Sequence, residues 1–259
     1  MALFTDADIV TLDDLLPYES SLVQVSSTHN IDVETKISLA TSVIGDKLML
    51  WLLNVRASDP QWLNRRLLGL STVVVSPTLQ KWVCFESLSR FFAEAYNVQL
   101  NTRFQGKWTE YKQAADDAAE IVFMSGIGVV YNPLPKPPMP FTSVQTGTTL
   151  PQALFIQTAW VDKFGNESAL SPVNGLVLQQ PSTVSVAMGD GSIGPPAAAI
   201  GWNVYAGPSS DNLTRQNNVA LAINTTWTLP ASGLIIGSEP INGQPPDVYV
   251  ILSHQIQRG

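Results

Sequence analysis

The side chains best suited to nucleophilic or metal chemistry in this sequence are one cysteine, Cys84, and two histidines, His29 and His254. A reactive cysteine needs a neighbouring base or cation to lower the pKa of its thiol, but Cys84 lies beside Phe85 in an apolar segment with no histidine near it. These three side chains cannot supply a zinc-ligand set. We therefore expect Cys84 to be a buried, unreactive thiol and both histidines to lie on the surface or in turns.

The densest group of carboxylates is formed by Asp116, Asp117 and Glu120. Adjacent residues on a helix diverge by about 100°, so acid–base or metal chemistry would need further groups from elsewhere, and we expect a solvated helix face. Asp190 offers a single carboxylate where calcium needs about six to eight oxygens. The fragment Gly126-Ile127-Gly128 lacks the preceding strand and the later glycine of a dinucleotide-binding loop. The sequence predicts no catalytic, cofactor-binding or metal-binding residue, and hence no enzyme.

Composition narrows the class of protein. Of 259 residues, 45% are hydrophobic and 14% are charged, so the chain can bury a large core. The net charge of -7 argues against a protein that coats a phosphate backbone or an anionic membrane. The acidic segment 1–14 does not resemble a targeting signal, and no apolar stretch approaches the roughly 20 residues of a membrane helix. We expect a soluble chain made in a cytoplasm.

The composition changes sharply near residue 132. Residues 1–131 hold 25 of the 35 charged residues, whereas residues 132–259 hold 15 of the 18 prolines. The break is the run Asn132-Pro133-Leu134-Pro135-Lys136-Pro137-Pro138-Met139-Pro140, which favours an extended spacer because proline lacks an amide proton and restrains the residue before it. The predicted organisation is a domain over 1–131, a linker over 132–145, a second domain over 146–240 and a tail over 241–259.

The first domain is predicted to be a helical bundle. Apolar residues recur at steps of three and four from Val33 to Val55, from Leu79 to Ala95 and from Trp108 to Val122, which is typical of amphipathic helices. Ser76 and Pro77 suit the start of the second of these helices. A shorter helix within residues 11–24 is expected to begin or break at Pro17.

The second domain is predicted to be an antiparallel β-sandwich. Short alternating segments separated by turn residues indicate strands within 155–161, 173–178, 183–188, 200–205, 219–223 and 225–229. Trp202 and Trp227 each lie in one of these strands and are expected to anchor the core. The predicted fold class is therefore α+β in two domains, with the sandwich of the immunoglobulin or fibronectin III kind.

Several segments carry a family resemblance. Phe91 to Tyr111 (FFAEAYNVQLNTRFQGKWTEY), residues 126–130 and the proline run together resemble the head-to-tail adaptor, or connector, proteins of tailed bacteriophages, and residues 13–53 fit the same helical domain. Residues 155–173 (FIQTAWVDKFGNESALSPV) and 201–216 (GWNVYAGPSSDNLTRQ) resemble the fibronectin-III or Ig-like modules that are often fused to phage structural proteins. The resemblance covers most of residues 10–235.

The resemblance implies a non-enzymatic structural virion protein of the neck, assembled in the host bacterial cytoplasm. About twelve copies would form a homo-oligomeric ring beneath the portal protein, joining the capsid to tail or neck proteins. Genomic DNA would pass through the lumen without sequence-specific binding, and no membrane would be involved. A net-acidic subunit suits that role because DNA slides past it instead of being held by counterion release. The adaptor family includes members with the helical domain alone, so the role of the added sandwich stays open.

Two sets of residues are candidates for the assembly interface. Trp62, Trp82 and Trp108 are large enough to anchor contacts between subunits, or they belong to the core of their own domain. The tail contains the β-forming run Val248, Tyr249, Val250, Ile251 and Leu252. This run either pairs within its own chain, beside residues 127–131, or adds as a strand to a neighbouring subunit or the portal.

A function of another class stays open. The β-sandwich is also suited to be a carbohydrate-binding or adhesion module on a tail or baseplate protein, with the helical domain as its mounting. Exposed aromatic rings at one edge of the sandwich, such as Phe164 or Tyr249, would favour that alternative because sugars stack on aromatic rings.

Overall fold

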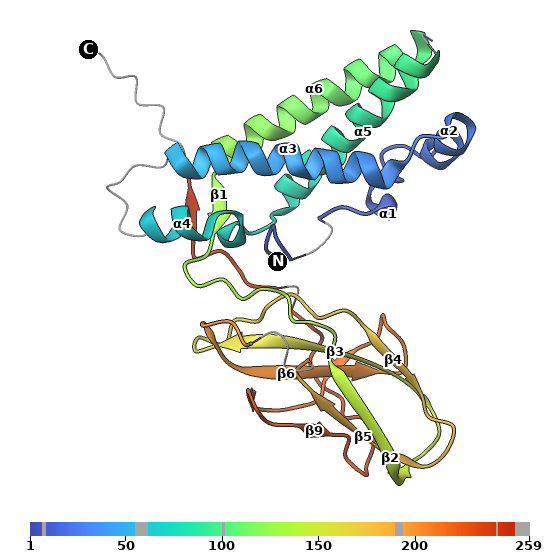
Figure 1. The fold of residues 1–259 in the computed structure, drawn as a ribbon, viewed down its shortest axis with the longest axis vertical. Helices are drawn as coiled ribbons and strands as arrows, with labels where there is room; N and C mark the ends of the chain where they lie inside the picture. The colour runs from blue at the N-terminus through green and yellow to red at the C-terminus, as the bar shows by residue number, and fades with distance from the viewer. Residues whose placement is uncertain (7–8, 55–61, 100–101, 190–193, 242, 252–259) are drawn as a thin grey trace. The chain divides into compact units, whose positions relative to one another are not determined.

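The computed structural model describes residues 1–6, 9–54, 62–99, 102–189, 194–241 and 243–251, with the backbone alone for residues 54, 62, 64, 65 and 99. The chain folds as two compact units. The helical unit comprises residues 7–131 and 246–259, and the β unit comprises residues 1–6 and 132–245. Figure 1 follows the chain through both by colour.

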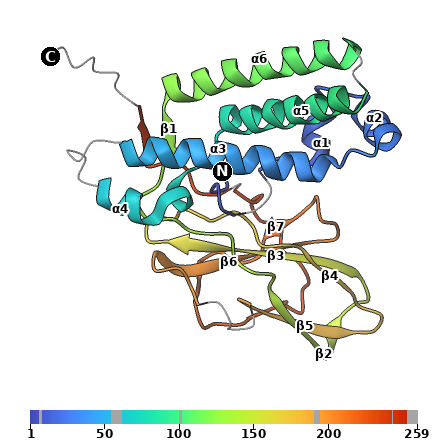
Figure 2. The ribbon, with the colours of Figure 1, turned by 45° about the horizontal axis from the view of Figure 1, so that its top comes forward.

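Three long helices build the helical unit: α3 (Val33–Asn54), α5 (Pro77–Gln99) and α6 (Thr102–Ser125). Helix α5 packs against both of the others, and Figure 2 shows the three side by side. The shorter elements are α1 (Leu12–Leu15), α2 (Leu22–His29), α4 (Trp62–Leu68) and the 3₁₀ helix η1 (Gly69–Thr72). Most residues of the predicted apolar stripes are buried between these helices; Trp108 is only partly buried, and Val55 lies outside the described residues.

The helix ends follow the local sequence. The hydroxyl of Ser76 accepts a hydrogen bond from the Leu79 amide (3.2 Å), which confirms Ser76 as the cap of α5. Helix α6 ends before Gly126, whose φ of +88° is a left-handed conformation that favours glycine. Pro17 lies between α1 and α2, so the helix expected within 11–24 is broken there.

A small sheet also belongs to the helical unit. Strand β1 (Ile127–Val129) pairs antiparallel with β10 (Val248–Val250), near the end of the chain. On its other side β1 meets residues 72–74: the Val74 amide donates to the Gly128 carbonyl and the Val130 amide donates to the Thr72 carbonyl, each at 2.9 Å. All three residues of β1 are buried.

The β unit holds two antiparallel sheets. One has the order β2-β5-β9, formed by Phe141–Thr149, Ser182–Ala187 and Trp227–Thr228. The other has the order β4-β3-β6-β7, formed by Asn174–Val177, Ala153–Asp162, Ala199–Gly207 and Thr214–Arg215, with β8 (Leu221–Ala222) also paired to β6. In the β3–β6 ladder Trp160 lies opposite Trp202, and the register shifts between Val161 and Asp162.

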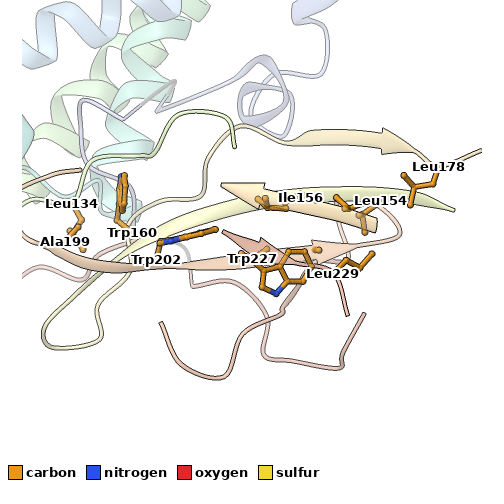
Figure 3. Close-up of a cluster of buried hydrophobic side chains, with 13 residues drawn as sticks. Leu134, Leu154, Ile156, Trp160, Leu178, Ala199, Trp202, Trp227 and Leu229 are labelled. Carbon is orange, nitrogen blue, oxygen red and sulfur yellow. The ribbon is translucent and has the colours of Figure 1, made fainter. Parts of the chain in front are cut away.

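One apolar core lies between the strands of the β unit (Figure 3). Its largest members are Trp160, Trp202 and Trp227, and all three are buried. This confirms Trp202 and Trp227 as core residues. Side chains alternate along a strand, so the residues that β3 and β6 send into this core are Leu154, Ile156 and Trp160, and Trp202, Val204 and Ala206. The alternation stops at the beginning of β6, where Ala199 joins the core and Ile200 is exposed.

Several boundaries differ from those expected. Strand β2 begins at Phe141, inside the predicted linker, and no sequence pattern predicted α4, β2 or β7. Residues 1–6 join the β unit, where the Asp6 carboxylate accepts hydrogen bonds from the amides of Lys136 (2.7 Å) and Leu3 (2.8 Å). Residues 246–251 join the helical unit because β10 pairs with β1.

The fold class is confirmed at the level of α+β: helices and several antiparallel sheets occur in separate parts of the chain. None of the helices in the described ranges is both long and apolar enough to cross a bilayer.

Candidate assembly surfaces

The three tryptophans proposed as interface anchors have different environments. Trp82 is buried in the helical unit, where its ring meets Phe123 edge-on (5.7 Å between centroids) and Lys47 lies over it. Trp82 therefore serves its own core, which is the alternative weighed above. Trp108 is partly exposed and stacks on Tyr96 (6.0 Å). The side chain of Trp62 lies outside the described residues.

The C-terminal run pairs within its own chain. In the β1–β10 ladder Ile127 lies opposite Val250, Gly128 opposite Tyr249 and Val129 opposite Val248. This confirms the intrachain alternative. Val248 and Val250 are partly buried, Tyr249 is 56% exposed and Ile251 is also exposed, while Leu252 lies outside the described residues.

Asp247 fixes the position of β10. Its amide donates to the Val129 carbonyl (3.0 Å), and its carboxylate accepts from the Tyr131 amide (2.7 Å). Gly128 allows the close approach, because a Cβ there would lie 3.0 Å from the side chain of Pro246. Strand β10 is thus held by its ladder with β1 and, at the C-terminal end of β1, by both bonds of Asp247.

Sequence reasoning missed a set of exposed apolar side chains in the helical unit. Leu67 on α4 is 75% exposed, and others include Leu53 at the end of α3, Leu63 on α4, and Ile121 and Met124 on α6. Part of this set could have been found from the sequence, because α6 carries the apolar residues Ile121 and Met124 outside the stripe that packs on α5. These side chains provide apolar area that association with another protein would bury.

The acidic residues of α6 are solvated, as expected. Asp116, Asp117 and Glu120 are all exposed, and the amide side chain of Gln113 donates to Asp117 (2.7 Å). The part of the chain that the structure describes contains no group of three or more His, Cys, Asp or Glu side chains able to hold a metal ion.

A charged and aromatic cluster connects α6 to the segment before α2. The buried Glu19 carboxylate accepts from the Tyr111 hydroxyl (3.0 Å) and the Ser21 hydroxyl (2.7 Å) and pairs with Lys107 (2.9 Å). Burial acts to raise the pKa of Glu19, but the hydrogen bonds from Ser21, Lys107 and Tyr111 outweigh it and hold that pKa below its usual value. Lys107 on α6 therefore pairs with a carboxylate from the segment before α2.

The single cysteine is buried, as predicted. Cys84 lies on α5, and burial, assisted by the nearby Asp14 carboxylate, raises the pKa of its thiol to about 12. The thiolate needed for nucleophilic chemistry is therefore disfavoured at neutral pH. His29 ends α2 and meets Phe104 edge-on, while His254 lies outside the described residues.

The β unit carries a second buried polar network, which the sequence did not reveal. The Glu167 carboxylate accepts from the Tyr205 hydroxyl and from the side-chain amide of Asn203, both at 2.5 Å. Arg215 on β7 donates to Asn203 (3.0 Å). Burial and the hydrogen bond to Glu167 raise the pKa of Tyr205. Every atom of the carboxylate is satisfied, so this network holds the segment after β3 onto β6 and β7.

Two aromatic rings are exposed among the described residues of the β unit: Phe141 at the start of β2 and Phe164 after β3. Phe164 is 74% exposed and has the Lys163 ammonium 4.9 Å from its ring centroid. Tyr249, the other ring considered above, lies on β10 in the helical unit. The two candidate rings therefore do not share one edge of the sandwich.

Comparison with models of known protein families gives no match. Comparison with curated proteins likewise gives none.

Proposed function

We propose that this chain is a structural virion protein: a head-to-tail adaptor that forms a ring of about twelve copies beneath the portal and connects the DNA-filled capsid to the tail. The observation that carries the proposal, beside the sequence resemblance, is the set of exposed apolar side chains on the helical unit. Leu63, Leu67 and Met124 cover no core of their own chain, so they are available for contacts between subunits.

The β unit supports the same proposal as an added module. A three-stranded sheet and a five-stranded sheet enclose one core, and this two-sheet antiparallel arrangement is that of an immunoglobulin-type sandwich, whose variants have seven or nine strands. We propose an Ig-like or fibronectin-III-like module on this basis. The net charge of -7 suits a ring through which DNA passes without being held.

The arrangement favours a non-enzymatic role. In the described residues the carboxylates of Glu19 and Glu167 are both engaged by hydrogen-bond donors, and the Cys84 thiol is buried. These three side chains therefore contribute to the structure of the protein.

The test is assembly on the portal. The purified chain is mixed with the portal protein of the same virus, and negative-stain imaging and sedimentation report whether a ring joins the portal. Leu67→Glu should abolish ring formation, because a charge replaces an exposed apolar contact. Leu150→Glu, a matched change at an exposed leucine of the β unit, should not. Absence of the chain from purified virions would refute the proposal.

A second candidate is supported by Phe164. An exposed ring suits stacking on a sugar, as in a carbohydrate-binding module of a tail or baseplate protein. Screening the chain against immobilised host glycans tests this alternative, with Phe164→Ala as the variant that should lose binding. Glycan binding without portal binding would favour the adhesion module over the adaptor.

A further inference from the structure

Strand β2 (Phe141–Thr149) has one unpaired edge. It lies at the end of the order β2-β5-β9, so β5 covers one side of its backbone and no described strand covers the other. Asn174 donates to the Pro140 carbonyl (3.0 Å) and the Thr142 hydroxyl (3.2 Å), at the beginning of the strand. From Ser143 onward, the described residues form ladder bonds with β2 from the β5 side alone.

This edge has few of the features that normally prevent strands from associating: its register with β5 shifts only near its end, between Thr146 and Thr149. Natural edge strands are short or carry charges or prolines, whereas β2 has nine residues and no charged residue or proline. Strands β5 and β9 are uncharged as well, so nothing in this sheet repels an approaching strand. Phe141 is exposed and Val144 is 48% exposed, and no residue of β2 belongs to the core of the β unit.

The length of β2 identifies its partner. The other edges among the described strands are two to four residues long: β4 has four, β10 has three, and β7, β8 and β9 have two each. Within described segments, only the β2 of a second copy matches β2 along its length. A two-fold axis relates two such strands in antiparallel orientation.

The sequence of β2 is compatible with pairing to itself. With the axis at Val144, the two valines face each other and Thr142 lies opposite Thr146 of the second copy. Phe141 then lies opposite Gly147, at the point where the β2–β5 register shifts, so the regular part of the pairing spans residues 142–146 of each copy. Ser143 lies opposite Gln145. No pair in this register places like charges together or buries a charge.

We propose that two copies of this chain associate through β2, in antiparallel register centred on Val144, to form one continuous six-stranded sheet. The pairing goes beyond the adaptor role and does not depend on it, since it uses the β unit and the adaptor ring is proposed to use the helical unit.

Charge substitutions test the register with matched variants. In S143K/Q145K each lysine lies opposite a lysine of the second copy, whereas in S143K/Q145E each lysine lies opposite a glutamate. Sedimentation of the full chain should give a dimer for the wild type and for S143K/Q145E. For S143K/Q145K the association should be weaker by about tenfold or more, which shifts the chain to monomer, because like charges opposite each other destabilise a strand pair. Val177→Lys, on the 76% exposed side chain of β4, should leave the dimer intact.

Cross-linking gives a second readout that works even within a larger assembly. Residues opposite each other in antiparallel strands have Cα atoms about 4.5–5.5 Å apart, within the range of a disulfide. Val144→Cys should therefore form a cross-linked dimer on mild oxidation. Val177→Cys should not, and neither should the wild type, whose one cysteine is buried.

The proposal is overturned if the wild type remains monomeric and Val144→Cys does not cross-link, which would leave the edge to a strand of another protein. It is also overturned if the two charge variants behave alike, because then the register or the interface is different.

Discussion

Removing residues 247–259 should destabilise the helical unit, because β10 is a structural strand of this chain. The truncation takes away the β1–β10 ladder and both hydrogen bonds of Asp247. At about 1 kcal/mol net for each hydrogen bond, these contribute about 3–4 kcal/mol. The partly buried Val248 and Val250 add about 1–2 kcal/mol through apolar burial. We expect a total loss of about 4–6 kcal/mol, which is large against the 5–15 kcal/mol typical of folded domains.

Urea unfolding followed by the circular dichroism of the helices measures this loss. With a slope of about 2–3 kcal/mol per molar urea, the midpoint should fall by about 2 M. The control is a truncation of residues 252–259 alone, which keeps every contact described for β10 and should unfold near the wild-type midpoint. A midpoint unchanged by removal of 247–259 would refute the structural role. It would then favour the other hypothesis, that the strand adds to a neighbouring subunit.

Three further outcomes are expected. Trp202→Ala should lower the free energy of unfolding of the β unit by about 3–5 kcal/mol in a urea titration, because it leaves a cavity in a fully buried site. A loss below about 1 kcal/mol would contradict the assignment of Trp202 to the core. Glu19→Gln should reduce the free energy of unfolding at neutral pH but much less in acid, because folding lowers the pKa of Glu19. The stabilisation by the carboxylate is present above the unfolded-state pKa and disappears as the pH falls through the folded-state pKa. Thermal melts of both proteins across that range should converge in acid, and parallel curves would show that the carboxylate charge is not responsible. Cys84 should react with a thiol reagent at mildly alkaline pH far more slowly in the folded protein than in urea, since burial raises its pKa to about 12; equal rates would mean that the thiol is accessible.

The sequence predicted the long helices and central strands well because their periodicity is strong. Helix α5 begins at Pro77 after its Ser76 cap, and β3 and β6 lie where alternating apolar residues were found. Strand β2 could not be predicted in the same way. Its side chains are mostly threonine, serine and glutamine, neither face is deeply buried, and the proline run before it suggested that the spacer continued to residue 145. Its place is set by main-chain pairing with β5, which is distant in the sequence and leaves no local pattern.

The interface candidates also show the difference between what a local sequence pattern predicts and what tertiary packing decides. The size of a tryptophan indicates that it will be buried but not against what, and Trp82 is enclosed by its own helices. The exposed Leu67 and Met124 are ordinary helix-forming residues whose exposure depends on which face of α4 and α6 the neighbouring helices cover. That depends on tertiary packing, so a pattern within a single helix cannot supply it.

The path of the chain ends determines how the two units can be separated. Residues 1–6 precede the helical unit in sequence but belong to the β unit, where Asp6 bonds the Lys136 amide; residues 246–251 follow the β unit but complete the small sheet of the helical unit. A cut within 132–140 therefore produces an N-terminal piece without β10 and a C-terminal piece without the Asp6 contact. Each piece loses hydrogen bonds that its own core residues rely on, so proteolysis there should weaken both units. The proline run joins the two units. Each unit includes a terminal segment that the other unit separates from it in the sequence, so the folding of the two units is linked.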